Sequence, residues 1–385
     1  MDIEHTVASA VAGVREDVLA LSHRLHAHPE VAWEEERASR WVAGALDDLG
    51  YEVRTGYCEL PTAVLARTGS GPLHVGICAE YDALPGLGHA CGHNLIAASA
   101  VGAAAALAHV ADDAGLTVSV LGTPAEEGGG GKIVLLDRGG FDGLHAAMMV
   151  HPGPVDVAEA EPFAVSHSAI RYRGKAAHAA AYPEAGVNAA DAFTVAQVAI
   201  GLLRQQLPPT VRVHGVQTRG GEAPNAIPEH TEGRWYVRAG SLDELAPVER
   251  RVRACFEAGA HATGCELEIE PESAPYSEFH NDEGLLAHYR RHATVLGRQF
   301  AAGSASARMN RASTDMGNVS RVIPAIHPYI GIDSLPAVNH QREFAAHCVT
   351  AAADRAVLDA ATAMALTAVE AARDDATRER LLHRA

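Results

Sequence analysis

The sequence predicts a mixed-sheet α/β domain that is interrupted by a smaller, ferredoxin-like α+β domain. Short apolar runs alternate with helix-favouring segments up to residue 151, a pattern typical of α/β sheets. After Pro162 the expected order becomes β-α-β-β-α-β, the order of a ferredoxin-like unit. A length of 385 residues agrees with two or three domains. We therefore expect residues 1–163 and 276–385 to form one domain, and residues 164–275 to form the insert.

The first elements are predicted from hydrophobic spacing. Residues 7–28 carry apolar side chains at helical spacing and end next to Pro29, and residues 34–49 repeat the pattern before Gly50. Two short strands are expected next, over residues 51–53 and 63–66.

Three apolar runs then predict buried strands, over residues 73–78, 117–121 and 147–150. The Ala-rich stretch 95–110 favours a helix between the first two. This stretch is too short for a membrane span, which needs about 20 apolar residues, and it contains Ser99 and Gly102. No membrane association is therefore expected.

The insert is expected to contain four strands and two helices. The strands are predicted over residues 164–173, 211–216, 233–238 and 267–269, and the helices over residues 188–203 and 242–262. From about Tyr276 the chain returns to the first domain. A last helix, over residues 351–373, is expected to cover the sheet of that domain.

Composition and charge exclude several classes of partner. A formal charge of −17 without a basic stripe argues against nucleic acid and against anionic membrane surfaces. Residues 1–16 include early acidic residues and lack the continuous apolar core of a signal peptide. The six cysteines are scattered and suggest no disulfide framework, so a reducing, cytoplasmic location is expected.

Potential metal ligands follow each of the three buried strands. Cys91 and His93 follow the first, Glu126 and Glu127 the second, and His151 the third. Each residue alone could be an ordinary loop residue, and a buried cysteine could be inert. Parallel strands, however, share a C-terminal edge, so these side chains are expected to converge. Thiolate, imidazole and carboxylate groups are ligands of zinc-class metals.

The residue types suggest a division of roles. Glu126 and Glu127 could serve as general base and metal ligand, because successive side chains at a strand end point in opposite directions. A Cys91 thiolate could bridge two ions, and Asp82 could accept the second ring N–H of His93.

A further ligand is needed from the C-terminal part of the chain. His340 is a candidate there, and spacing leaves His347 and His327 as rivals. The glycine-rich stretch 128–132 does not match a phosphate-binding loop and is expected to let the backbone approach the metal site.

Two segments, 80–85 (EYDALP) and 89–94 (HACGHN), resemble the aminoacylase–carboxypeptidase family of two-metal peptidases. More narrowly they are similar to its amidohydrolase subfamily, in which a cysteine replaces the bridging aspartate. The short connection between the two segments is most similar to aminobenzoyl-glutamate hydrolase and the aminoacylase-like dipeptidases. Hippurate and indole-acetyl-amino-acid hydrolases are more distant. The resemblance extends from His26 to the C-terminal helix.

The resemblance implies a set of site residues. The implied metal ligands are Cys91, His93, Glu127, His151 and His340, which favours His340 over its rivals. They imply two divalent ions per chain, zinc or manganese foremost with cobalt or nickel as alternatives, about 3.5–4 Å apart. The implied catalytic residues are Glu126 as general base, Asp82 as the acid that orients the site, and His178. Asn225 and Arg238 match the pair that holds a substrate carboxylate, whereas Asp315 matches the subgroup without an assigned role.

The implied activity is a metal-dependent amidohydrolase that cleaves N-acyl amino acids or related carboxylate-bearing amides with metal-activated water. One alternative is a dipeptidase of the same mechanism, and another is a metal-dependent carboxylate or peptide binder without turnover. Glu126 argues against the binder, since a binder needs no base. The insert matches a lid and dimerisation domain whose histidine reaches the partner's active site, so a homodimer is expected.

Overall fold

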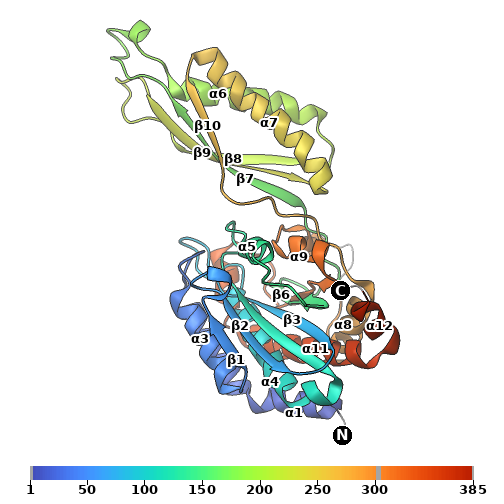
Figure 1. Ribbon diagram of the computed structural model, residues 1–385. Coiled ribbons are helices and arrows are strands. Elements are labelled where there is room, and N and C mark those ends of the chain that lie inside the picture. Colours follow the sequence, from blue (N-terminus) through green and yellow to red (C-terminus); the bar gives the residue numbers. More distant parts are fainter. Residues whose placement is uncertain (1–2, 301–304, 384–385) are drawn as a thin grey trace. The chain divides into compact units, whose positions relative to one another are not determined.

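The computed structural model describes residues 3–300 and 305–383. The chain divides into two compact units, Met1–Glu161 with Phe279–Ala385 and Pro162–Glu278. Figure 1 shows the elements of each unit, which are described separately below. These bounds differ by a few residues from the 163/164 and 275/276 boundaries expected from the sequence.

The first unit is built on a six-stranded mixed sheet with the order β1-β2-β4-β3-β5-β11. Its strands are β1 Glu52–Thr55, β2 Val64–Gly69, β3 Leu73–Glu80, β4 Leu116–Thr123, β5 Ala146–Met148 and β11 Ala325–Ile326. The last four are parallel, whereas β1 and β2 run antiparallel to their neighbours. A small second sheet pairs β6 (His151–Gly153) with β12 (Tyr329–Gly331). The predicted mixed-sheet α/β class is confirmed.

The helices of this unit are α1 Ile3–Gly13, α2 Arg15–Ala27, α3 Glu36–Asp48, α4 His93–Ala114, α5 Gly131–Asp137, α8 Glu283–Val295, α9 Met316–Val322, α10 Arg342–His347, α11 Ala351–Arg373 and α12 Asp375–Leu382, with short 3₁₀ turns at Tyr57–Glu59 and Ala305–Arg311. The single helix expected over residues 7–28 is divided at Val14, where φ is −100° and ψ is 9°.

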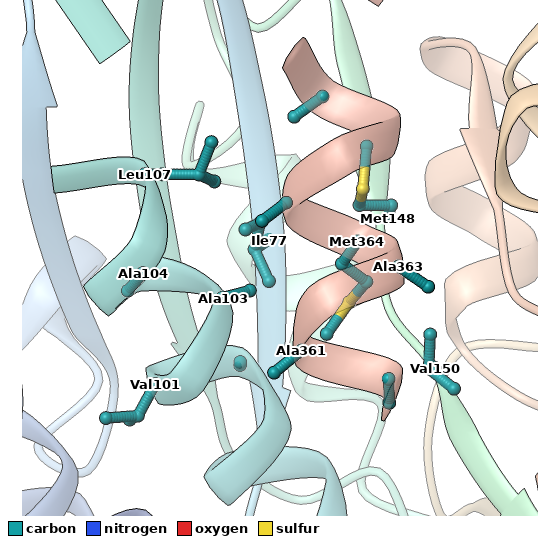
Figure 2. Packing of buried hydrophobic residues seen from close by; sticks show 14 of the residues in the cluster. Ile77, Val101, Ala103, Ala104, Leu107, Met148, Val150, Ala361, Ala363 and Met364 are labelled. Atoms are coloured by element: carbon teal, nitrogen blue, oxygen red, sulfur yellow. The ribbon is translucent and has the colours of Figure 1, made fainter. Parts of the chain in front are cut away.

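Helix α4 lies at the centre of the main core. It packs against α11, and a Cβ added at Gly102 would lie 2.8 Å from the Cβ of Ala361. Figure 2 shows Ile77 of β3 with Ala103 of α4 and Ala361 of α11, which belong to the same buried cluster. Small side chains at this contact allow the two helices to approach each other closely.

The expectation that the α4 segment is too short for a membrane span needs correction. The helix has 22 residues and is long and apolar enough by length and composition. However, 89% of its most apolar window is buried inside the structure. Helix α4 therefore has the surroundings of a core helix.

The sheet is covered on both faces, and this concentrates its polar chemistry at one edge. Val75 and Ile77 of β3 join the core formed by α4 and α11, whereas Cys78 joins a second core with Leu121 and Leu135. Strands buried on both faces are apolar along their length. Polar side chains therefore appear where these parallel strands end, which is where ligands bind in α/β sheets.

The second unit has the ferredoxin-like order expected from the sequence. Its elements are β7 Ala164–Arg173, α6 Ala189–Leu203, β8 Arg212–Arg219, β9 His230–Ala239, α7 Leu242–Thr263 and β10 Glu266–Pro271, with 3₁₀ turns at Pro183–Ala185 and Arg204–Gln206. The antiparallel sheet has the order β10-β7-β9-β8. Trp235 of β9 packs against Phe193 of α6 and Phe256 of α7, so both helices contact the same face of the sheet (Figure 1).

Candidate metal centre

The loop between β3 and α4 provides the first part of the site. Gly92 separates Cys91 from His93 and has a φ of 82°, a conformation that suits glycine. A Cβ at this position would also lie 2.5 Å from Pro152. The tight turn places the thiol of Cys91 and the imidazole of His93 at the N-terminus of α4, and both residues are buried.

The other strands contribute the remaining ligands. Glu126 and Glu127 follow β4, and His151 begins β6 rather than directly ending β5. The chain leaves the main sheet after Met148 and pairs with β12 in the second sheet, which brings His151 beside Cys91. His340 approaches from the C-terminal segment, where its backbone N–H donates to Ala90 O at 2.8 Å.

All five predicted ligands lie close together, in two groups that share Cys91. One group is Cys91, His93 and His151, and the other is Cys91, Glu127 and His340; the ligand atoms within each group lie within 4.8 Å of one another. Cys91 Sγ is 3.6 Å from His151 Nε2. His340 Nε2 is 3.4 Å from Glu127 Oε1. This arrangement is the one expected if a single thiolate serves two ions.

Asp82 orients two members of this cluster. Its Oδ1 lies 2.9 Å from His93 Nδ1, and its Oδ2 accepts the backbone N–H of Glu127 at 2.9 Å. The hydrogen bond between Asp82 and His93 expected from the sequence is therefore present. With a proton on Nδ1, neutral His93 directs the lone pair of Nε2 toward the cluster, as in a metal-ligating histidine.

One expectation about the two glutamates is wrong. Their side chains do not diverge, because Oε2 of Glu126 is 3.8 Å and Oε1 of Glu127 is 3.9 Å from His93 Nε2. Strand β4 ends at Thr123, so both residues lie in a turn where strand alternation does not apply. Ala125, just before them, has a φ of 57°. The turn lets both carboxyl groups face the same cluster.

The surroundings shift the pKa values of Cys91 and Glu126 in opposite directions. Burial would raise the pKa of the Cys91 thiol, but the neighbouring His340 and His151 hold this pKa well below its usual range. Cys91 is therefore expected to be a thiolate, the form that binds metal. Burial and the nearby carboxyl groups of Glu80 and Glu127 raise the pKa of Glu126 well above its usual range. A raised pKa suits a carboxylate that must take up a proton.

The donors fit divalent ions. His93 Nε2 and Glu127 Oε1 are buried without a hydrogen-bond partner among the residues that the structure describes. Buried polar atoms are rarely left unpaired without a reason such as a bound ion. Three imidazoles, a thiolate and carboxylate oxygens within a few ångströms form a donor set that suits zinc-class metals.

The two rival histidines do not join the ligand groups found in residues 3–300 and 305–383. His327 is buried and stacks on the ring of His151 with a centroid distance of 5.5 Å. His347 is the last residue of α10. His340, by contrast, has a φ of 69°, and its neighbour Asn339 donates to Pro152 O at 3.2 Å. These contacts fix the segment that carries His340 beside the cluster.

Glu35 is a residue of the site that the sequence pattern did not reveal. Its Oε1 accepts the N–H groups of Trp33 and Ala125, at 3.0 and 2.8 Å, and its Oε2 accepts the Thr62 hydroxyl at 3.0 Å. It therefore holds the turn that carries Glu126. Burial and the charge of Asp82 raise the pKa of Glu35 from 4.5 to about 7.

We expect the free energy of unfolding of the metal-free Glu35→Gln variant to increase, relative to that of the unaltered chain, as the pH rises. The folded-state pKa of about 7 exceeds the usual 4.5, so Glu35 costs the fold stability progressively between these values. Glutamine keeps the shape without ionising. Urea unfolding at pH 5 and pH 8 should show the difference in free energy of unfolding growing in favour of the variant, by at most about 3 kcal/mol. The exposed neighbour variant Glu34→Gln is the control, and a difference independent of pH would contradict the prediction.

The predicted residues of the insert lie in the second unit. His178 and Asn225 are brought together there by backbone contacts. The N–H of Ala179 donates to Asn225 O at 3.0 Å, and His178 and Ala226 form an isolated antiparallel β-bridge. His178 is exposed, and its Nδ1 accepts the backbone N–H groups of Ala180 and Ala181 at 3.3 and 3.1 Å. A neutral His178 therefore carries its proton on Nε2.

Arg238 lies in β9 of the same unit. Its Nε donates to His214 Nε2 at 3.1 Å. Its neighbour Val237 is buried in the core beneath the helices. Strand alternation therefore directs Arg238 to the opposite face of the sheet. The roles of His178, Asn225 and Arg238 in catalysis and substrate binding stay predictions.

Curated relatives resemble the whole chain. It is 40% identical to Xaa-Arg dipeptidase of Mus musculus, across 96% of this chain and 88% of the relative. It is 26% identical to a p-aminobenzoyl-glutamate hydrolase chain of Escherichia coli, across 96% and 92% of the two chains.

Solved structures share the fold. An aminobenzoyl-glutamate utilization protein from Klebsiella pneumoniae superposes with a TM-score of 0.74 at 19% identity, covering 94% of this chain and 97% of the other. A dinuclear metal-binding M20 peptidase from Bacillus subtilis gives 0.69 at 22% identity, covering 94% and 99%.

The resemblance identified from the sequence is confirmed by these comparisons. They also support the predicted class of activity, a metal-dependent amidohydrolase or dipeptidase. The profile of peptidase family M20/M25/M40 matches residues 76–371, which include every predicted metal ligand. This protein is therefore a hydrolytic enzyme, and the chain belongs to peptidase family M20/M25/M40.

Proposed function

We propose that this enzyme is a dipeptidase that uses two divalent ions to cleave the peptide bond before a C-terminal residue with a free carboxylate. The observation that carries the proposal is the pair of ligand groups sharing Cys91, beside the buried carboxyl group of Glu126. The 40% identity to Xaa-Arg dipeptidase supports a dipeptide substrate over an N-acyl amino acid. It also supports a basic C-terminal residue, such as arginine.

The residues of the centre divide the reaction between them. The ions would be held by Cys91, His93, Glu127, His151 and His340, and when bound they supply Lewis acidity. Glu126 takes a proton from the attacking water and returns it to the leaving amine, a role that its raised pKa favours. The tautomer of His178 offers its Nε2–H as a donor to the developing oxyanion.

Charge supports the choice of a cationic substrate. The chain carries a formal charge of −17, which attracts positively charged small molecules and raises their association rate. Asn225 and Arg238 are proposed to hold the free carboxylate, for which the guanidinium group has a matching geometry. The substrate would then present its carboxylate to Arg238.

A substrate panel tests this function. The purified enzyme is assayed with Ala-Arg, Ala-Lys, Ala-Ala and N-acetyl-arginine, each with zinc, manganese, cobalt or nickel. We expect turnover of the dipeptides, highest for the basic ones, in the presence of at least one metal. Preferential cleavage of N-acetyl-arginine would instead identify an N-acyl-amino-acid hydrolase. Tight substrate binding without turnover of any compound would identify a binding protein.

We expect Cys91→Ser to lower the metal content of the enzyme. A serine hydroxyl is a poor substitute for a thiolate that serves two ions. Cys348→Ser is the matched control, because Cys348 is also buried but donates to Phe344 O at 3.3 Å, a bond that serine can keep. Elemental analysis after reconstitution should find two ions per chain in the control and fewer in Cys91→Ser. Equal metal content in both variants would contradict the assigned role of Cys91.

Two further features belong to the proposal. A cytoplasmic location is supported by six free cysteines, which agree with a reducing compartment. A homodimer is supported by the second unit, whose edge strand β8 exposes Val216 to 59% and could pair with another copy. Fractionation of cells and light scattering of the purified protein test these two features.

A further inference from the structure

Lys132 forms a buried ionic network beside the metal centre. The sequence contains two lysines among its 31 basic residues, Lys132 and Lys175. Of the lysines and arginines that the structure describes, Lys132 is the one that is buried. Its ammonium donates to Asp315 Oδ1 at 2.7 Å and to Glu80 Oε1 at 2.5 Å. Asp315 also accepts the backbone N–H of Lys132, at 2.9 Å.

Stability alone is a weak explanation for this network. All three side chains are completely buried, and removing charges from water is costly. Apolar residues of similar volume often serve a protein core equally well or better. The network also has a specific location, because Glu80 ends β3 two residues before Asp82. This location suggests a role in the centre itself.

The second oxygen of Glu80 faces a metal-binding nitrogen. Glu80 Oε2 lies 3.5 Å from His93 Nε2, and both atoms are buried without a hydrogen-bond partner among the described residues. The Nδ1 atom of His93 already has Asp82 as its partner, which leaves Nε2 for another partner. Two atoms of metal-binding type therefore face each other in a buried site, where a cation between them could bind both.

The spacing of these atoms matches a shared ion. Ligand atoms about 2.0–2.2 Å from a tetrahedral ion lie about 3.4 Å from one another. The observed separation of 3.5 Å between Glu80 Oε2 and His93 Nε2 is close to this value. Glu80, His93 and Glu126 also form a third group of candidate ligand atoms, all within 4.8 Å of one another.

We propose that Glu80 is an oxygen ligand of the ion that His93 binds, and that Lys132 is the positioning residue that holds Glu80 in place. Lys132 fixes Oε1 and leaves Oε2 for the ion, while Asp315 anchors Lys132 through two hydrogen bonds. A compact ammonium suits this position better than the wide, planar guanidinium group of arginine. The inference rests on the proposed function, since it requires that the centre binds divalent ions.

A crystal structure of the unaltered enzyme loaded with zinc tests the inference without any substitution. We expect Glu80 Oε2 at about 2.0–2.2 Å from the ion next to His93. A distance above about 3 Å, well outside that bonding range, would overturn the inference and leave the proposed function intact. Failure of the unaltered chain to bind any ion would instead reject the proposed function.

Metal affinity of two variants provides a second test. Glu80→Gln keeps an oxygen for Lys132 but offers a neutral group to the ion, and Lys132→Met removes the positioning charge. In zinc competition with a chelator, each substitution should lower the affinity for one of the two zinc ions by at least about 10–100-fold. A loss of this size is typical when a partner of a metal ligand is removed. The absorption spectrum of the cobalt-loaded enzyme should also change, because it reports the coordination of the ion.

The control is Asp359→Asn, which removes an ion pair with Arg298 elsewhere in the same unit. It should leave both zinc affinities and the cobalt spectrum unchanged. Selective weakening of one ion in Glu80→Gln and Lys132→Met supports the inference. Unchanged affinity, or equal weakening of both ions, would mean that the network is structural and would overturn it.

Discussion

Replacing Glu126 by glutamine should reduce turnover by at least the roughly 10²–10⁴-fold typical of lost general acid–base catalysis. Glutamine preserves the size of the side chain but can neither accept the proton of the attacking water nor return it to the leaving amine. Glu126 is buried, and its pKa is raised by burial and by the carboxyl groups of Glu80 and Glu127. Steady-state kinetics with a cleaved dipeptide measure the change.

Two measurements and two comparison variants separate this effect from other causes. Metal content and thermal unfolding of Glu126→Gln should match the unaltered enzyme, since Glu126 is proposed as base and not as ligand. Glu127→Gln should instead lose metal, because Glu127 belongs to a ligand group with Cys91 and His340. The exposed variant Glu16→Gln should behave as the unaltered enzyme. Near-normal turnover of Glu126→Gln would assign the base to another group.

The sequence was most informative about features that depend on which residues and elements follow one another along the chain. The segments that follow strands β3 and β4 carry residues of ligand type, and parallel strands share an edge, so the convergence of Cys91, His93 and Glu127 could be predicted. The ferredoxin-like order of the insert followed from strand and helix patterns alone. Hydrophobic periodicity records such features directly.

The remaining parts of the site depend on contacts between distant segments. Glu35 lies 90 residues from Ala125, whose N–H it accepts, and Lys132 lies 183 residues from Asp315. In the sequence Lys132 follows four glycines and resembles a loop residue. Its burial arises because α5 packs against α9, and a Cβ at Gly131 would lie 1.8 Å from Pro124 O. Local patterns contain no information on such packing.

A similar limit explains the error over Glu126 and Glu127. Strand alternation was extended past the end of β4, although β4 ends at Thr123. The left-handed conformation of Ala125 then redirects the chain. That conformation is uncommon for a residue other than glycine. The two N–H bonds that Glu35 accepts, one of them from Ala125 itself, hold this turn in place.

The last prediction concerns the assembly of the site from two chains. The resemblance implies that His178 acts in the active site of the partner subunit, whereas Glu126 acts in its own. We therefore expect His178→Ala chains and Glu126→Gln chains to be inactive separately. After subunit exchange, each mixed dimer should contain one site with both residues intact. Random exchange of equal amounts should restore about a quarter of the activity of the unaltered enzyme, since half the dimers are mixed.

The control mixture combines His178→Ala chains with chains that carry both substitutions. It should stay inactive, because none of its sites contains both Glu126 and His178. Formation of mixed dimers is verified with chains of different tag mass before the assay. If mixed dimers of the two single variants form and stay inactive, His178 acts within its own chain or has no catalytic role. Restored activity would establish the second unit as a shared part of both active sites, which its exposed His178 and its edge strand β8 make structurally feasible.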